Sequence, residues 1–344
     1  KVYKKLNAAQ KKAVDTIEGP VMVIAGPGTG KTQILGARIG KILLETDTAP
    51  ENILCLTYTD AGAIAMRKRL MDFIGTAAYK VTISTFHSFC NDIIQDNLSL
   101  FEKPSLDPIS ELEKIALLKE LIDQFDKTNP LKRFKGDVYY EMTNLSKLFS
   151  TMKKEGWDVS FLTEQIDQYI QTIPFRDEFV YQRKYKQFEA GALKQGLVDD
   201  ALEKMGKLKA AVAAFDEYQG LMKKHGRYDF DDMINWVIRA FKENKNLLAQ
   251  YQERYLYILV DEFQDTSGTQ NELVQLLTNY WEQPNLFVVG DDDQSIFRFQ
   301  GANVENMLHF QTQFKEDIVN IVLEQNYRST QPILDASTQV INQN

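Results

Sequence analysis

Residues 21–32 read V-M-V-I-A-G-P-G-T-G-K-T, an apolar run followed by a glycine-rich turn that ends in Lys31 and Thr32. The run predicts a buried strand, and the sequence I-L-G-A-R-I at 34–39 predicts a helix directly after the turn. Glycines in such a turn let backbone N–H groups face an anion, and the helix presents its positive N-terminal end to the same place. The stretch therefore predicts a phosphate-binding loop between a strand and a helix.

Each loop position has an expected task. Lys31 should reach the β- and γ-phosphates of ATP, and the Thr32 hydroxyl should bind Mg²⁺. Ala25 replaces the first glycine of the general pattern, and its small side chain leaves the turn open. The nucleotide-binding residues expected here are Ala25, Gly26, Pro27, Gly28, Thr29, Gly30, Lys31, Thr32 and Gln33.

A second segment, L-V-D-E-F-Q-D-T at 259–266, lies far downstream in the chain. Its apolar start predicts a strand that ends at Asp261 and Glu262, and ligands bind at the carboxyl ends of strands in open α/β sheets. Alone, such an acidic pair is more often a solvated strand end. Together with the phosphate loop it predicts an ATP-hydrolysing site in which Asp261 holds Mg²⁺ and Glu262 polarises the attacking water.

Composition limits the class of protein. The 344 residues exceed one ordinary domain, and the absence of a long apolar run leads us to expect a soluble, cytoplasmic chain with no membrane partner. The net charge of −8 means that any nucleic-acid site must be local. Cys55 and Cys90 lie in apolar patterns and are expected in the core, not in a disulfide or metal site.

Strand and helix signals predict an α/β fold with a parallel sheet, interrupted by a helical insertion. The expected strands cover 21–25, 53–58, 81–85, 256–260, 285–289 and 318–323. We assign 1–100 and 228–316 to the ATP-binding domain and 101–227 to the helical insertion.

The insertion contains basic clusters that could contact a nucleic-acid backbone, although each could equally be an ordinary solvated helix face. These are 132–135, 153–154, 183–186, 204–209 and 223–227. At the end of the insertion, Asp229–Asp232 reads D-F-D-D, and we expect a helix cap there because Asp satisfies free N–H groups.

Seven segments in the same order resemble those of the UvrD/Rep/PcrA-like superfamily 1 DNA helicases. They are Leu6–Gln10, Leu56–Thr59, Thr85–Phe89, Asp229–Asp232, Val260–Asp265, Gly290–Phe297 and Glu324–Thr330, together with the phosphate loop. The resemblance implies a RecA-like P-loop NTPase domain with an inserted all-helical domain. It also implies that residues 317–344 begin a second RecA-like domain.

For the nucleotide, the resemblance implies four further residues. Gln10 is similar to the glutamine that reads the adenine edge, and Tyr327 to the tyrosine that stacks on the base. Gln294 resembles the γ-phosphate sensor, and Arg328 resembles the arginine finger, so the implied catalytic residues are Lys31, Glu262, Gln294 and Arg328. Gln33 departs from the family, which has an adenine-sandwiching Arg at that position.

For DNA, the resemblance implies contacts from Tyr58, His87, Phe297 and Phe299 to single strands and to junctions of single- and double-stranded DNA. Aromatic faces stack on bases without reading sequence. The alternative for Tyr58 and Phe297 is a core position at a strand end. The pair Phe299-Gln300 replaces the family's Trp-Arg, which removes a larger ring and a cation.

The resemblance implies an ATP-dependent DNA helicase or translocase of 3′→5′ polarity that acts in repair or recombination, with repair proteins as possible partners. Three alternatives remain: the motor of a helicase–nuclease subunit, an ATP-regulated DNA-binding module without translocation, and a P-loop small-molecule kinase. The family continues with a second RecA-like domain, and this sequence ends at Asn344. We therefore expect that these residues alone do not unwind duplex DNA.

Overall fold

The computed structural model describes residues 3–101, 106–132, 136–291 and 305–341. The chain forms two compact units. The first combines Lys1–Phe101 with Met233–Asn344, and the second is Glu102–Asp232. The expected insertion, 101–227, differs from this second unit by one residue at its start and five at its end.

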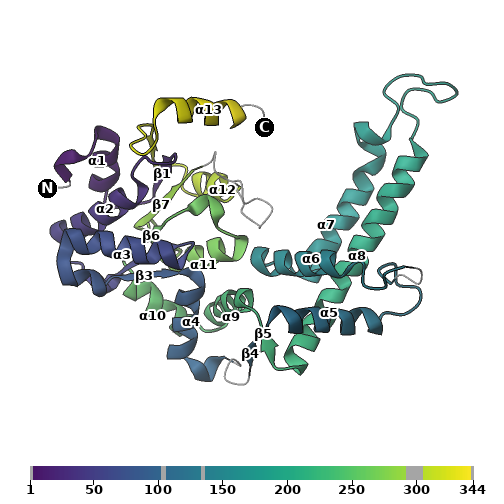
Figure 1. Cartoon of the computed structure of the whole chain (residues 1–344), viewed down its shortest axis with the longest axis horizontal. Coiled ribbons are helices and arrows are strands. Elements are labelled where there is room, and N and C mark those ends of the chain that lie inside the picture. The colour runs from purple at the N-terminus through teal and green to yellow at the C-terminus, as the bar shows by residue number, and fades with distance from the viewer. Residues whose placement is uncertain (1–2, 102–105, 133–135, 292–304, 342–344) are drawn as a thin grey trace. The chain divides into compact units, whose positions relative to one another are not determined.

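The first unit is built on a six-stranded sheet in which every described pair of strands is parallel (Figure 1). The strand order is β3-β2-β6-β7-β1-β8. Parallel sheets are covered on both faces, so their strands are continuous apolar runs; all residues of β2, β6 and β7 are buried. The strands are β1 Val21–Ala25, β2 Ile53–Thr57, β3 Thr82–Thr85, β6 Tyr257–Val260, β7 Leu286–Gly290 and β8 Val319–Leu323.

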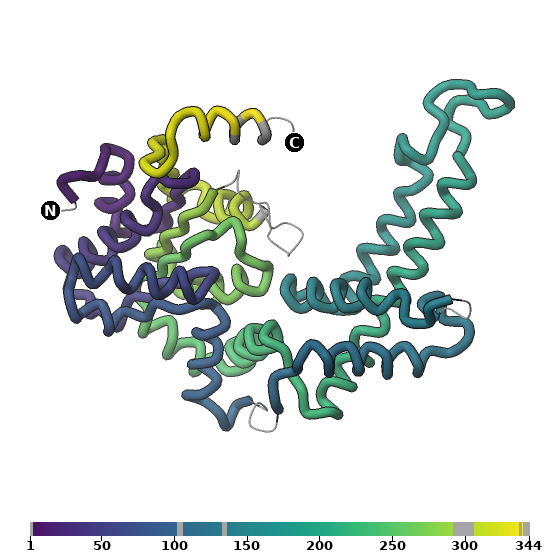
Figure 2. Tube along the Cα trace, viewed as in Figure 1, coloured from purple at the N-terminus to yellow at the C-terminus, as the bar shows by residue number. Residues whose placement is uncertain are grey.

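Helices from both ends of the chain belong to this unit, and Figure 2 shows its purple-to-blue and green-to-yellow segments side by side. They are α1 Ala8–Asp15, α2 Lys31–Glu45, α3 Asp60–Ile74, α4 Phe86–Asp96, α10 Lys245–Arg254, α11 Gly268–Thr278, α12 Glu305–Gln313 and α13 Gln331–Ile341, with most of α9 Phe230–Glu243. One apolar core joins α1, α2 and α3 to strands β1, β2, β6, β7 and β8.

The last strand, β8, lies after residue 317, where the resemblance implies the start of a second domain, and it belongs to the same sheet as β1. The start of a second domain at residue 317 stays a prediction. Strand β8 pairs with β1 in register from Val21↔Val319 to Ala25↔Leu323, and Ile321 and Leu323 are buried in the same core. A parallel partner satisfies the backbone groups along one side of β1. The described residues that follow 317 therefore lie in the first unit.

A buried arginine fixes α1 against α2 and the sheet. Arg38 is only 1% exposed, and its Nη1 donates to the carbonyl oxygens of Ala13, at 2.7 Å, and of Thr16 at the end of α1. Its guanidinium also lies 4.4 Å from the ring centroid of Phe287. Burial lowers the pKa of Arg38 to about 9, so the group is still charged at neutral pH and complements the negative end of the α1 dipole.

The second unit is helical, with α5 Glu111–Gln124, α6 Met142–Glu155, α7 Val159–Thr172 and α8 Gln195–Lys224 around a core of their own (Figure 1). Two short parallel strands, β4 Asp107–Pro108 and β5 Arg227–Tyr228, pair where the chain enters and leaves it. Among the described residues, no helix is long and apolar enough to cross a membrane.

The D-F-D-D segment caps α9, as the sequence predicts. The N–H of Asp232 donates to Asp229 Oδ1 at 3.1 Å, and the N–H of Asp229 donates to Asp232 Oδ2 at 2.8 Å. A third partner, which no local pattern predicts, is Lys153, whose Nζ lies 2.6 Å from Asp229 Oδ2 and 2.8 Å from Asp232 Oδ1. The Lys153 side chain is 2% exposed, so this member of a basic cluster is an internal ion-pair partner and not a surface contact for DNA.

Both cysteines are free and fully buried, Cys55 in β2 and Cys90 in α4, which confirms their expected core positions. Burial raises the pKa of each thiol. Thiols in such surroundings are unreactive packing residues.

Candidate active site

Chemical groups from distant parts of the sequence meet at the carboxyl edge of the sheet. Because the strands are parallel, all of their carboxyl ends lie on one edge, in the order β3, β2, β6, β7, β1, β8. The phosphate loop follows β1, Asp261 follows β6, and Tyr58 follows β2. The N–H of Asp261 donates to Leu56 O at 2.9 Å and so fixes the acidic pair beside the end of β2.

Neighbouring segments hold three consecutive carbonyl groups of the phosphate loop. Pro27 O accepts from the Asn326 side chain, Gly28 O from the N–H of Tyr327 at 2.9 Å, and Thr29 O from Gln10 Nε2 at 2.8 Å. The C=O and N–H of one trans peptide point in opposite directions, so the N–H groups of the following residues point away from these partners. Within the turn, the N–H of Thr29 donates to Gly26 O at 3.4 Å. Phosphate binding by the other N–H groups of the loop stays a prediction.

Gly28 is required by its surroundings. Its φ is +71°, in the left-handed region, and a Cβ here would lie 2.6 Å from Arg328 Cβ and 2.8 Å from Asn326 Oδ1. Any side chain at this position would both strain the loop and displace the segment that follows β8.

The two segments predicted to carry the chemistry are in direct contact. Lys31 Nζ, in the first turn of α2, donates to Glu262 Oε2 at 3.0 Å, although 231 residues separate them. Glu262 has φ +50°, which is unusual for a residue with a side chain and is typical of functional positions. Thr32 and Gln33 lie in the same first turn of α2 as Lys31.

Gln264 positions Glu262, and the sequence analysis assigned it no role. It is 1% exposed; its Nε2 donates to Glu262 Oε2 at 3.0 Å and to Asp265 Oδ2 at 3.2 Å, while its Oε1 accepts from the N–H of Asp291 at 3.0 Å. The amide therefore links the strand ends of β6 and β7. Its place two residues after Glu262, in the D-E-F-Q-D segment, was the available signal.

The carboxyl groups around Glu262 are difficult to ionise. Burial, reinforced by the neighbouring Glu262 carboxylate, raises the pKa of Asp261 to about 7 and that of Asp265 to about 6. Asp265 Oδ1 is buried and accepts no hydrogen bond from the residues that the structure describes. A cluster of this kind gains from a cation, because opposite charge restores the ionised form.

Tyr327 and Arg328 reach the phosphate loop from the end of β8. Both are exposed, and Tyr327 is 61% exposed. The Tyr327 hydroxyl donates to Gln325 Oε1 at 2.7 Å and accepts from Asn7 Nδ2 at 2.9 Å. The ring is therefore held at its hydroxyl group, and a face of the ring is available to solvent.

Gln10 is placed differently from what a free adenine reader requires. It is 4% exposed, its Nε2 is bonded to Thr29 O, and its Oε1 accepts from the N–H of Asn7 at 3.1 Å. In this arrangement Gln10 supports the loop and caps α1; its contact with adenine stays a prediction. Asn7 and Asn326 are the other supporting residues to which the sequence analysis assigned no role.

Tyr58 and His87 follow neighbouring strands, β2 and β3, at the other end of the same edge. Thr57 and Thr85 are register partners in β2 and β3, so the residues after them leave neighbouring strand ends. Tyr58 is 39% exposed, and His87 lies in the first turn of α4. A hollow of about 390 Å³ adjoins this region, and Thr85, Ser88 and Lys68 are among its lining residues.

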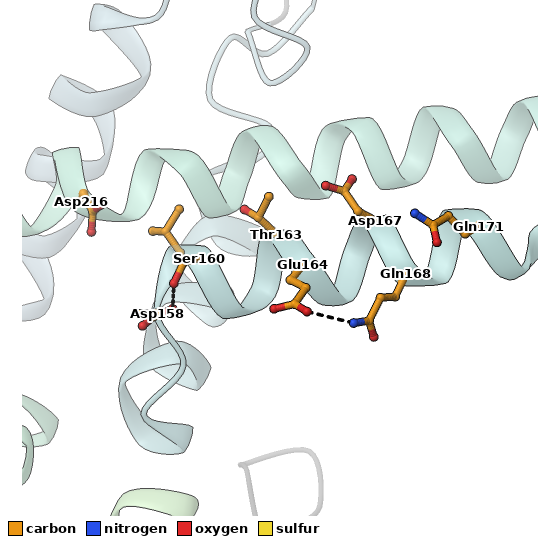
Figure 3. Close-up of a pocket in the computed structure, with 9 residues that line it drawn as sticks. Asp158, Ser160, Thr163, Glu164, Asp167, Gln168, Gln171 and Asp216 are labelled. Carbon is orange, nitrogen blue, oxygen red and sulfur yellow. Dashed lines mark hydrogen bonds between the residues drawn. The ribbon is translucent and has the colours of Figure 1, made fainter.

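In the helical unit, two lysines of the predicted basic cluster 204–209 form ion pairs. Lys207 pairs with Glu203 at 2.7 Å, and Lys209 pairs with Asp167 at 2.8 Å. A hollow of about 860 Å³ along α7 also contains Asp158, Glu164, Asp167 and Asp216, and its lining residues, all in the described part of the chain, include neither Lys nor Arg (Figure 3). This negative surface disfavours a phosphate ligand.

Three predicted site residues, Gln294, Phe297 and Phe299, lie outside the described residues. No group of three or more His, Cys, Asp or Glu side chains suited to a metal ion occurs in the described ranges.

The parallel sheet, the glycine-rich turn after β1 and the acidic pair after β6 define a RecA-like α/β protein. The family model described as UvrD/REP helicase N-terminal domain matches residues 6–315. The chain belongs to the UvrD/REP helicase family.

Two relatives illustrate the relationship. A protein of Staphylococcus epidermidis named ATP-dependent DNA helicase PcrA is 32% identical over 347 residues, which covers 100% of this chain and 41% of the relative. The protein of the same name from Staphylococcus aureus is 33% identical over 341 residues, which covers 98% of this chain and 40% of the relative. This chain thus spans about two fifths of the length of these relatives.

Proposed function

We propose that the protein is an ATP-dependent DNA helicase or translocase whose ATP site lies at the carboxyl edge of the sheet. The contact between Lys31 and Glu262 carries the proposal, because it brings the phosphate loop and the acidic pair into one site. Family membership argues against the small-molecule kinase alternative.

In the proposed site, N–H groups of the loop and Lys31 bind the phosphates. Thr32 and Asp261 would hold Mg²⁺, which neutralises charge on the transferring phosphoryl group. The buried Asp261 carboxyl fits this task, since a divalent ion would offset the burial that raises its pKa. Asp265 Oδ1, which is buried and has no hydrogen-bond partner in the described part of the chain, would offer a further acceptor to a water of the ion.

Glu262 would orient and polarise the attacking water. Gln264 supports this role because its amide holds one carboxylate oxygen of Glu262. Arg328 would act as the arginine finger and Gln294 as the γ-phosphate sensor. Tyr327 would stack on adenine, with Gln10 and Gln33 in the same nucleotide site.

The DNA track would begin at Tyr58 and His87 and continue to Phe297 and Phe299. The strand order supports coupling between the DNA track and the ATP site. Strand β2, which precedes Tyr58, is next to β6, which precedes the acidic pair, and β7 then joins β6 to the phosphate-loop strand β1. The proposal includes 3′→5′ polarity, action on single strands and junctions in repair or recombination, repair proteins as partners, and a cytoplasmic location. The names of the PcrA relatives support its ATP and DNA parts.

Two other functions share these residues. The motor of a helicase–nuclease subunit would require a nuclease active site elsewhere in the protein. A DNA-binding module regulated by ATP would keep the site without translocation, and Gln33 in place of Arg keeps this alternative open. ATP turnover stimulated by single-stranded DNA separates the module from both motors.

The first test is titration of fluorescent oligo-dT with Mg²⁺, with and without a non-hydrolysable ATP analogue, at two salt concentrations. Binding that weakens with salt and shifts with nucleotide would support the proposal, because two ligands that alter each other's affinity share an equilibrium. Nucleotide binding without any oligo-dT binding would count against a DNA track on this chain.

A further inference from the structure

One side chain joins the phosphate loop to the turn that bears Arg328. The Asn326 amide nitrogen donates to Pro27 O, and its Oδ1 accepts from the N–H groups of Arg328 and Ser329, both at 2.8 Å. Asn is suited to this position because its short amide both donates and accepts. It closes its own turn with the oxygen and has the nitrogen left for a second segment.

The contact is reinforced by the neighbouring backbone. The N–H of Tyr327 donates to Gly28 O at 2.9 Å, so two successive residues of the turn bind two successive loop carbonyls. Arg328 Cβ lies only 2.6 Å from the point that a Cβ on Gly28 would occupy. The Arg328 side chain therefore starts directly beside the loop.

We propose that Asn326 is a positioning residue that places Arg328 over the phosphate loop and thereby sets how strongly the site prefers ATP to ADP. The inference rests on the proposed ATP site. The loop N–H groups would contact phosphates that both nucleotides share. A finger that starts beside Gly28 would add a contact with the γ-phosphate to the one expected from Lys31. Without the amide bridge, the finger would be free to leave that position.

Substitutions separate the two sets of bonds that Asn326 makes, the bond to Pro27 O and the bonds from the N–H groups of its own turn. Asn326→Ala removes both. Asn326→Ser keeps a hydroxyl that can accept from the turn N–H groups but is too short to replace the bond to Pro27. Asn320→Ala is the matched control, since Asn320 is an exposed residue of the neighbouring β8.

The experiment measures Kd in the 344-residue chain for a fluorescent non-hydrolysable ATP analogue and for fluorescent ADP, with Mg²⁺. We expect Asn326→Ala and Asn326→Ser to reduce the preference for the triphosphate about tenfold, the effect of one hydrogen bond to a charged group. Affinity for ADP should change little, and Asn320→Ala should match the parent. Arg328→Ala should lose the same preference, and adding Asn326→Ala to it should cause no further loss.

Several results would overturn the positioning role while leaving the ATP site intact. These are a parental triphosphate preference in Asn326→Ala, full rescue by Asn326→Ser, and additive losses in the double variant. Equal weakening of both nucleotides would indicate a general loop defect and would also count against it. If the parent chain bound neither nucleotide, the proposed function itself would fall.

Discussion

Lys31 Nζ and Glu262 Oε2 lie 3.0 Å apart, and the Lys31 side chain is 12% exposed. The ammonium group expected to bind phosphate is therefore already paired with the carboxylate expected to polarise water. Nucleotide phosphates would share Lys31 with Glu262, which would leave the carboxylate freer to accept a hydrogen bond from water. Lys31 thus connects phosphate binding to the group that acts on the water.

Glu262→Gln should abolish hydrolysis while leaving nucleotide binding intact. The amide keeps the size of the side chain but cannot polarise water as a carboxylate does, and we expect ATP turnover to fall by about 10²–10⁴-fold. Affinity for an ATP analogue should stay within about threefold of the parent, because phosphate contacts come from the loop. Steady-state phosphate release and analogue titration measure the two effects.

The control for that change is Glu272→Gln, on α11, where the carboxylate pairs with Lys242 at 2.5 Å. Turnover in the control should match the parent. Substantial turnover in Glu262→Gln would mean that another group polarises the water.

Gly28→Ala should damage the nucleotide site more than backbone strain alone would. Gly19 offers the matched control, with φ +75° close to the +71° of Gly28 but nothing within 4 Å of an added Cβ. We expect each variant to lose about 1 kcal/mol of unfolding free energy from strain. Gly28→Ala alone should also lose affinity for ATP analogue, by about tenfold or more, because Asn326 and Arg328 must move. Equal affinities in the two variants would show that the close approach has no importance for binding.

Asp261→Asn should stabilise the protein in the absence of Mg²⁺ and nucleotide, with a defined pH dependence. The folded-state pKa of Asp261 is raised from 3.8 to about 7. Between these values the folded state binds a proton that the unfolded state lacks, so this group's contribution to stability falls as pH rises. The free energy of unfolding of the variant should therefore rise relative to that of the parent between pH 4 and pH 8. The rise should be at most about 4 kcal/mol, since one pKa unit is about 1.4 kcal/mol.

Thermal unfolding in EDTA at pH 4.5, 6 and 8 measures that gain. A constant difference between variant and parent across this range would contradict the raised pKa. With Mg²⁺ and ATP analogue the order should reverse, because the parent alone keeps the carboxylate for the ion.

Lys153→Met should destabilise the helical unit by about 3–5 kcal/mol, the usual cost of removing one partner from a buried ion pair. It leaves the Asp229 and Asp232 carboxylates close together at the start of α9 without their cation. Lys147→Met, on the exposed face of the same helix α6, should change the urea midpoint little. Adding Asp229→Asn to Lys153→Met should recover part of the loss, and a further loss would contradict this account.

Local sequence was a good guide wherever one segment contains the whole signal. Apolar runs predicted β2 and β6 because buried parallel strands are apolar throughout, and D-F-D-D predicted a cap because both partners lie within four residues. Gln264 and Asn326 received no role because each also binds a distant segment, Gln264 at the N–H of Asp291 and Asn326 at the carbonyl of Pro27. From the sequence, Lys153 was predicted only as one member of a basic cluster. Its burial in the folded unit is what makes it an ion-pair partner.

By itself, the sequence determined the class of chemistry and the fold, because the phosphate loop and the acidic strand end each encode a local geometry. The tertiary structure decided which of these groups touch. It brought Lys31 to Glu262 across 231 residues, paired β8 with β1, and placed Asn326 on the loop carbonyls. The physical reason is that strand order is set by how the helices and strands bury their apolar faces together, and no single stretch of sequence contains that information.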